Sequence, residues 1–337
     1  MRVSKANLAA AVANEGCAGV IAAVGLGDYE NSPGVDFAEV NAIALREEIR
    51  KARKLTNGII GVNAMVALTD YKSLIDVCVQ EKVDMIFSGA GLPLQLPAYT
   101  AGTDIKLVPV VSSMRSLQVI YRKWMRDFNR APDAVVVEGM LAGGHLGYSF
   151  EQIEQNRPSL EEIIADVLQF TRQLPQPIPV IAAGGIYGGE EMLHYLNCGA
   201  SGVQMATRFV CTEECDVDIR FKKAYLNARP EDIMLIKSPV GLPGKVIRNA
   251  FVDRINRGET MPFRCKYRCL RTCDPSAAPY CIAEVLAKAS AGKMDESFAF
   301  AGSNAWRCNE IVSVKVLIEK IMQEYKNAEC FKPVGSA

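Results

Sequence analysis

Residues 179–208 read PVIAAGGIYGGEEMLHYLNCGASGVQMATR, in which two apolar runs flank a helical pattern. The runs Pro179–Ala183 and Gly202–Met205 are almost continuously apolar, which is typical of parallel strands buried on both faces. Between them, Glu190–Asn197 has the pattern of a helix that ends at Gly199, because glycine readily adopts the left-handed conformation that terminates helices. The stretch therefore predicts a strand–helix–strand unit with a right-handed crossover.

The same alternation of strands and helices extends toward the N-terminus. Five further strands are predicted, with helical segments between them: Gly19–Val24, Ile59–Val66, Val83–Ser88, Lys106–Val111 and Ala134–Val137. Such an alternation is typical of an α/β protein, either a closed barrel or an open doubly wound sheet. We expect a (β/α)8 TIM-type barrel whose first strand is missing or is replaced by another segment, because the pattern has one strand fewer than eight and begins on a helix.

Start signals of helices support this alternation. Polar N-cap residues precede four predicted helices, and two of these caps have a glutamate three positions later that would complete a capping box. The predicted caps are Ser4, Asp36 (with Glu39), Asp70 and Ser159 (with Glu162).

After Phe209 the alternation stops. The stretch Cys211–Phe300 contains several prolines and is predicted to be irregular, whereas Asn309–Tyr325 again has a helical apolar pattern. We therefore expect three parts: a barrel over residues 1–210, an inserted lid segment over residues 211–303, and a closing barrel helix over residues 304–328.

The composition limits the partners that the chain can bind. Lys plus Arg and Asp plus Glu number 38 each, so no charge excess favours nucleic acid or an anionic membrane. No apolar run approaches the ~20 residues of a membrane helix, and Leu8–Ala13 is shorter than the ~7–15 residues of a signal-peptide core. We expect a cytoplasmic protein whose partners are small molecules or other protein chains, with a homodimer left open.

The cysteines indicate thiols and not a disulfide framework, because their number, eleven, is odd and the chain is predicted to be cytoplasmic. Four of them form a cluster: Cys265, Cys269, Cys273 and Cys281. Their spacing matches neither the ferredoxin patterns nor the close cysteine pairs of zinc sites. Reduced or reversibly oxidised thiols are favoured over a metal site, and no metal is predicted.

Two turns are typical of a phosphate-binding site. In a TIM-type barrel the active site lies at the carboxyl ends of the strands, and phosphate commonly binds after strands seven and eight. Gly184 and Gly185 open a glycine cluster at the first of these positions, where glycine lets the backbone approach a phosphate and the next helix N-terminus favours an anion. After the following strand, the amides of residues 204–208 and the Thr207 hydroxyl would complete the cradle.

The stretch 138–147, EGMLAGGHLG, directly follows the predicted strand Ala134–Val137, which places His145 at the barrel mouth. The flanking glycines offer little packing surface, and they let a flat ring or a substrate approach the imidazole. An ordinary histidine pKa of ~6.5 suits proton transfer near neutral pH, so a catalytic role is favoured. His194 is the only other histidine, and its place in a helix predicts a surface or packing role.

Together these motifs resemble the nitronate monooxygenase (2-nitropropane dioxygenase) family. The resemblance rests on residues 142–147, 182–186 and 202–209, with 60–63 and 238–244 also similar, and it extends in order over almost the whole chain. It implies a TIM-type barrel that binds FMN and oxidises nitronates or nitroalkanes with oxygen.

The resemblance also implies roles for single residues. His145 would be the catalytic base. Asn63 and Glu138 would contact the flavin, with Glu138 standing where the family often has glutamine, and Gly143 would lie against the isoalloxazine ring. The phosphate would be bound by Gly184, Gly185, Gln204, Met205, Ala206 and Thr207.

Two other functions stay open. The FMN-dependent enoyl-thioester (enoyl-ACP) reductases, which use NAD(P)H, carry a similar Gly-Gly-His stretch, and a flavin-binding protein without turnover would share the same fold. The nitronate monooxygenase family opens with a strand that ends in a Gln-Gly-Gly-Met-like loop, and nothing matches it before Met1. Because unpaired strand edges are normally covered, we expect a version extended upstream by this strand and loop to be more stable and to bind FMN more tightly.

Overall fold

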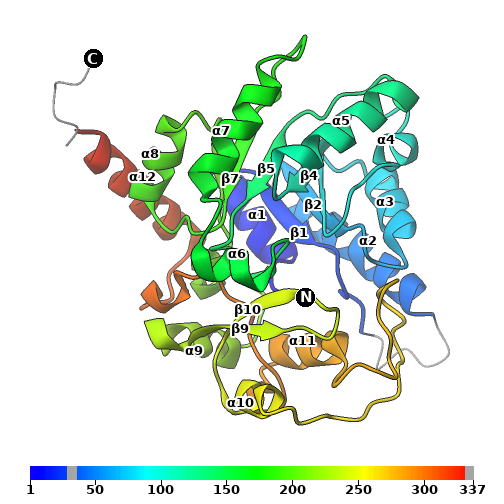
Figure 1. Cartoon of the computed structure of the whole chain (residues 1–337), viewed down its shortest axis with the longest axis vertical. Helices are drawn as coiled ribbons and strands as arrows, with labels where there is room; N and C mark the ends of the chain where they lie inside the picture. The colour runs from blue at the N-terminus through cyan, green and yellow to red at the C-terminus, as the bar shows by residue number, and fades with distance from the viewer. Residues whose placement is uncertain (29–35, 331–337) are drawn as a thin grey trace.

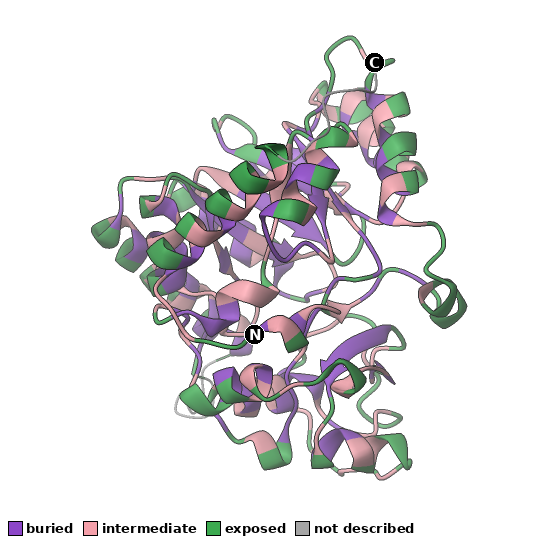
Figure 2. Ribbon diagram, turned by 90° about the vertical axis from the view of Figure 1, so that its left-hand side faces the viewer, coloured by how far each residue is buried: buried purple, intermediate pink, exposed green. Residues whose placement is uncertain are grey.

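The computed structural model of the protein describes residues 1–28 and 36–330, and its centre is a sheet of seven parallel strands surrounded by helices (Figure 1). Coloured by exposure, the central strands are mostly buried, whereas the helices expose their outer faces (Figure 2). The strands, in their order across the sheet, are β1 (Gly19–Ala22), β2 (Ile60–Met65), β3 (Met85–Gly89), β4 (Lys106–Val111), β5 (Val135–Glu138), β7 (Val180–Ala183) and β8 (Gly202–Gln204).

All seven predicted strands are present, each within two residues of its predicted bounds. Consecutive strands of this sheet are neighbours in space, whereas an open doubly wound sheet reverses its order at a switch point. The prediction of a TIM-type barrel with one strand fewer than eight is therefore confirmed. In the described part of the chain, β1 pairs with β2 and β8 pairs with β7, which leaves these two strands as the edges.

The N-terminal residues lie along the outer edge of β1. The Ala22 amide donates to the Ser4 carbonyl at 3.0 Å, and the Ser4 hydroxyl donates to the Val20 carbonyl at 2.5 Å. The prediction that Ser4 caps the first helix is therefore wrong, because its hydroxyl is used by β1. Helix α1 (Ala6–Asn14) begins after Lys5, whose amide instead donates to the distant Asp216 carboxylate at 3.0 Å.

The other three predicted cap residues occupy the N-cap positions of their helices. Asp36 accepts from the Ala38 amide at the start of α2 (Phe37–Leu55), although no capping box with Glu39 forms. Ser159 and Glu162 form the predicted capping box of α7 (Leu160–Thr171). Asp70 occupies the N-cap position of α3 (Tyr71–Gln80), as predicted, but its carboxylate makes no cap bond and accepts instead from the Asn41 side chain at 2.9 Å.

The main apolar core lies between the sheet and the helices that cover it. Leu45 and Ile49 of α2 and Leu74 of α3 are fully buried there, as are Leu117 and Trp124 of α5 (Met114–Phe128). Burying such side chains contributes roughly 1.5–3 kcal/mol each. Among the helices that the structure describes, none has both the length and the apolar composition to cross a bilayer.

The closing helix α12 (Val314–Cys330) begins five residues later than the helical pattern at Asn309 predicts. The Val314 amide is capped by the Glu214 carboxylate at 2.9 Å, and Val312 forms a bridge with Thr212, so the residues before Val314 are extended. The helix packs closely against α8 (Gly189–Asn197).

Gly189 provides a test of this helix contact. A Cβ atom at this position would lie 2.0 Å from the Tyr325 amide nitrogen and 2.3 Å from the Ile321 carbonyl oxygen, so alanine would force the helices apart. We expect Gly189→Ala to lower the free energy of unfolding by about 1–3 kcal/mol, the usual cost of overpacking. Gly202→Ala is the control, because its Cβ would meet nothing within 4 Å. Unfolding of both variants in urea checks this. If Gly189→Ala is as stable as the parent protein, α8 and α12 can move apart without a cost in free energy.

The segment 211–303 is more regular than predicted. It contains helices α9 (Ile219–Leu226), α10 (Ala250–Asn256) and α11 (Ile282–Ser290), and a hairpin of β9 (Ile233–Lys237) and β10 (Pro243–Ile247). Strand β10 also pairs with β6 (Gly144–His145), which belongs to the turn after β5. The hairpin therefore attaches this segment directly to the stretch that carries His145.

Candidate active site

His145 lies at the carboxyl end of the barrel strands, held by the pairing of β6 with Gly244 of β10. Its Nε2 atom lies 2.7 Å from the Ser238 hydroxyl oxygen, and its ring contacts the Phe300 ring with a centroid separation of 4.9 Å. Burial lowers the pKa of the imidazole to about 4. The side chain is therefore neutral near pH 7 and can accept a proton, but its pKa lies below the ~6.5 expected from the sequence, so the free imidazole is a weaker base than predicted.

The two glycines before His145 differ in their surroundings. Gly144 has a φ of +83°, and no atom lies within 4 Å of the position that a Cβ would occupy, so there is open space beside the histidine. Gly143 is needed for a different reason, because a Cβ there would lie 2.5 Å from the Ala301 carbonyl carbon. The Cβ side of Gly143 is thus covered by residues 301–302, and its contact with an isoalloxazine ring stays a prediction.

The predicted phosphate residues come together at the ends of β7 and β8. Gly184 and Gly185 have φ values of +95° and +84°, which favour glycine. Within the described residues, the amides of Gly184, Gly185 and Ala206 have no hydrogen-bond acceptor. Thr207 starts the short helix η2 (Thr207–Cys211), whose first N–H groups also lack partners inside the helix. Gly184 and Gly185 are partly exposed and Ala206 is exposed, so these amides are accessible to a ligand, and a phosphate oxygen would provide an acceptor for them.

Residues 302–304 connect the two halves of this cradle. The Gly302 amide donates to the Thr207 hydroxyl oxygen at 3.1 Å, and the Asn304 side-chain amide donates to the Gly185 carbonyl at 2.6 Å. The Thr207 hydroxyl still has its own proton to donate. Gln204 ends β8 opposite Ala183, and Met205 follows it, so both lie beside the cradle and are partly exposed.

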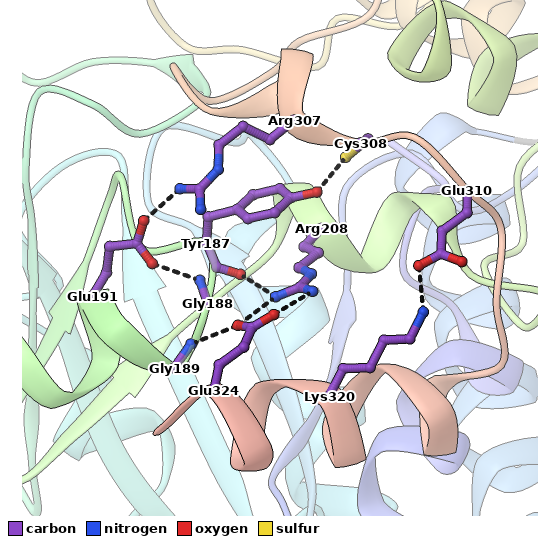
Figure 3. Close-up of polar contacts among 10 residues, drawn as sticks. All are labelled: Tyr187, Gly188, Gly189, Glu191, Arg208, Arg307, Cys308, Glu310, Lys320 and Glu324. Carbon is purple, nitrogen blue, oxygen red and sulfur yellow. Dashed lines mark hydrogen bonds and ion pairs between the residues drawn. The ribbon is translucent and has the colours of Figure 1, made fainter. Parts of the chain in front are cut away.

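The N-terminus of α8 is already occupied by carboxylates, which corrects the expectation that it favours a bound anion (Figure 3). The Gly188 amide donates to Glu191 at 2.9 Å, and the Gly189 amide donates to Glu324 at 2.9 Å. Arg208 binds the same Glu324 carboxylate with two hydrogen bonds of 3.0 and 2.9 Å. A phosphate would therefore bind one turn earlier, at Gly184 and Gly185.

Tyr187 lies in the glycine turn itself, and its ring is held between the side chains of Arg208 and Arg307, as Figure 3 shows. The Arg208 and Arg307 guanidinium carbons lie 4.8 and 4.4 Å from the ring centroid, within cation–π range. The Tyr187 hydroxyl donates to the Cys308 sulfur at 3.6 Å. These contacts hold the glycine turn rigidly against the segment that follows residue 304.

Glu138 is the last residue of β5, whereas Asn63 lies inside β2, two residues before its end. Desolvation raises the pKa of the Glu138 carboxyl to about 7, and in the described residues no group donates a hydrogen bond to it. The Tyr148 hydroxyl donates to the Glu138 carbonyl at 2.6 Å and holds the backbone. The Asn63 side chain is partly exposed on β2. Both side chains are thus available to a ligand, and their flavin contacts stay predictions.

The raised pKa of Glu138 makes stability depend on pH. Because the folded carboxyl keeps its proton above pH 4.5, the folded state loses stability as the pH rises toward 7. We expect Glu138→Gln to make the flavin-free protein about 1–3 kcal/mol more stable at pH 8 and to change little at pH 4.5. Thermal melts at both pH values check this, with Glu154→Gln on the protein surface as control. A Glu138→Gln gain that is the same at both pH values would contradict it.

Three residues of the site were not identified from sequence: Ser238, Lys245 and Asn304. Ser238 lies in a stretch used for the family resemblance, but its contact with His145 depends on the β9–β10 hairpin. Lys245 and Asn304 gave no local signal, because their partners are far away in the chain. His194, as predicted, lies on the surface, where it contacts Glu161 at 2.9 Å.

Other hollows and clusters lie away from this site. Two cavities of about 610 and 400 Å³ are lined by residues between 220 and 299 and include no predicted site residue. Cys265, Cys269, Cys273 and Cys281 are free and partly buried. Over the described ranges 1–28 and 36–330, no group of three or more His, Cys, Asp or Glu side chains is arranged to hold a metal ion.

Comparison with known proteins supports the family resemblance. A family model described as nitronate monooxygenase matches residues 1–324. A Staphylococcus aureus protein named "Probable nitronate monooxygenase" is 29% identical over 195 residues, which is 56% of this chain and 50% of that protein. A Rhodococcus jostii protein is 26% identical over 259 residues, 77% of this chain and 64% of its own length; it is named (3aS,4S,5R,7aS)-5-hydroxy-7a-methyl-1-oxo-octahydro-1H-indene-4-carboxyl-CoA dehydrogenase. The chain thus matches about two thirds or less of the length of these relatives.

Solved structures give the same fold. FabK from Thermotoga maritima has a TM-score of 0.76 and 29% identity, with 97% of this chain and 90% of that chain covered. A nitroalkane oxidase from Streptomyces ansochromogenes has a TM-score of 0.75 and 21% identity, with 98% and 94% covered. At that identity the second likeness concerns the fold alone.

Proposed function

Because this chain belongs to the nitronate monooxygenase family, we propose that it is an FMN-dependent oxidoreductase that oxidises nitronates or nitroalkanes with oxygen, with His145 as the base. The observation that carries this proposal is the neutral, half-buried imidazole of His145 beside the open space at Gly144. The substrate's α-carbon would occupy that space. The name of the Staphylococcus aureus relative supports the same reaction.

The residues present fit FMN. The amides of Gly184, Gly185 and Ala206, which have no acceptor within the described residues, would hold the phosphate, and the Thr207 hydroxyl would donate a further bond. Asn63 and Glu138 would contact the flavin ring system from β2 and β5. When bound, FMN supplies the redox chemistry, taking electrons from the substrate and passing them to oxygen.

The role of His145 follows from its protonation state and its neighbours. With a neutral nitroalkane, the imidazole takes the α-proton while the C–H electron pair stays on the substrate, which becomes the nitronate. The Ser238 hydroxyl orients the ring through its contact with Nε2, and Phe300 packs on the ring and restricts water. A general base in this position typically contributes about 10²–10⁴-fold to the rate.

Reduction of an enoyl thioester with NAD(P)H is the second candidate. The Rhodococcus jostii relative is named for a carboxyl-CoA substrate, which favours a thioester ligand. An anaerobic titration of the flavin-loaded protein with NADH, NADPH and a nitronate separates the candidates by absorbance. Bleaching by the nitronate supports the proposal, bleaching only by a nicotinamide cofactor favours the reductase, and no bleaching indicates a flavin-binding protein without turnover.

The site further predicts that the bound flavin is FMN and not FAD. The cradle holds one phosphate, and no dinucleotide-binding glycine fingerprint follows a strand in this sequence. Flavin released by heating and identified by chromatography should therefore be FMN. Recovery of FAD would require a second phosphate site and would overturn the assignment of the cradle.

A further inference from the structure

Lys245 of β10 is a buried lysine without an acidic partner. The residue is 6% exposed, and its ammonium donates to the Met140 carbonyl at 2.6 Å and to the Ser303 hydroxyl oxygen at 2.7 Å. No carboxylate of the described residues pairs with it, and burial lowers its pKa to about 8. An ammonium has three N–H donors, so one remains free of these two bonds.

Lys245 lies beside both halves of the phosphate cradle. Ser303, its partner, is flanked by Gly302, which bonds to Thr207, and by Asn304, which bonds to Gly185. The turn that contains Met140 packs on Gly184, where a Cβ would lie 2.8 Å from the Gly139 carbonyl oxygen. The ammonium therefore joins the same two loops that approach Gly184 and Gly185.

A buried cation without a counterion costs several kcal/mol, so a protein that keeps one normally pairs it with an anion. The amides of Gly184 and Gly185, next to the loops that Lys245 joins, have no acceptor among the described residues and can donate to a ligand. A phosphate monoester suits the ammonium and these amides at once, because it is an anion of nearly two charges with several acceptor oxygens.

We propose that Lys245 provides the positive charge that binds the phosphate of FMN, and that it makes the protein prefer FMN over riboflavin. This inference rests on the proposed function, in which the cradle binds FMN. If Lys245 only tied the loops together, glutamine, which keeps a bond to the Met140 carbonyl, would preserve the preference for FMN. If Lys245 supplies the charge, its neutral replacements weaken FMN alone, since riboflavin differs from FMN by the phosphate alone.

Binding of FMN and of riboflavin to flavin-free protein, followed by quenching of flavin fluorescence, tests the proposal. In Lys245→Met we expect FMN affinity to fall about 10–100-fold, as for the loss of a hydrogen bond to a charged group, while riboflavin affinity changes less than about threefold. Lys245→Gln, neutral but able to bond the Met140 carbonyl, should behave in the same way and serves if the methionine variant does not fold. Lys245→Arg should retain a preference for FMN.

Lys222→Met is the matched control. Lys222 is also 6% exposed and donates to two backbone carbonyls, those of Thr212 at 2.6 Å and Glu213 at 3.3 Å, but it lies on α9. Its loss should leave the FMN-to-riboflavin ratio unchanged. Equal weakening of both flavins in the neutral Lys245 variants, or no change in either, would overturn the proposal. If the parent protein binds neither flavin, the proposed function itself fails.

Discussion

His145→Ala is expected to retain bound FMN and to lose turnover of a neutral nitroalkane by about 10²–10⁴-fold, the usual contribution of a general base. A preformed nitronate has already lost the α-proton, so its oxidation should be affected much less. The difference between the two substrates is the diagnostic result, because a loss of folding or of flavin would reduce both rates.

His194→Ala is the control for this variant. It removes the only other histidine, which lies exposed on α8 in contact with Glu161 and away from the site. It should leave both rates unchanged. If His145→Ala reduces the oxidation of nitroalkane and nitronate equally, His145 does not act mainly as a base.

The second large effect is expected at Gly184. Alanine there would strain a backbone with a φ of +95° and would place a Cβ 2.8 Å from the Gly139 carbonyl oxygen, so the cradle amides would move. We expect Gly184→Ala to weaken FMN binding by about 100-fold, corresponding to roughly 2.7 kcal/mol. Equilibrium titration of flavin-free protein with FMN checks this value.

Gly102→Ala is the control that distinguishes the effect of a distorted phosphate cradle from the effect of backbone strain alone. Gly102 also has a positive φ, +76°, but its Cβ would meet nothing within 4 Å, and it lies in the loop after α4 (Leu96–Tyr99). It should be destabilised by strain while binding FMN like the parent. An unchanged FMN affinity in Gly184→Ala would mean that the phosphate binds elsewhere.

The barrel could be predicted from sequence because its signals are local. Most strands are short apolar runs that are largely buried, and Gly199 marks the end of a helix by its own backbone preference. The Ser159 capping box is equally local and was correctly predicted. The Ser4 cap failed because a tertiary contact with β1 competes for the same hydroxyl.

The hairpin and the side chains that complete the site were not predictable in this way. Prolines at 239 and 243 flank short strands, and β10 gains its partners β6 and β9 only through the fold. The contact of Ser238 with His145 spans 93 residues and that of Lys245 with Met140 spans 105, so no local pattern could reveal either. The same holds for Glu324, whose carboxylate accepts from the Gly189 amide at the start of α8, 135 residues away in the chain.

The central claim, that this chain uses FMN to oxidise a nitronate, is tested most directly by mixing the FMN-loaded protein with a nitronate under anaerobic conditions and following flavin absorbance near 450 nm. We predict bleaching of the flavin by the nitronate and recovery of the absorbance when oxygen is admitted. An absorbance that the nitronate leaves unchanged, in protein shown to contain FMN, would contradict the claim.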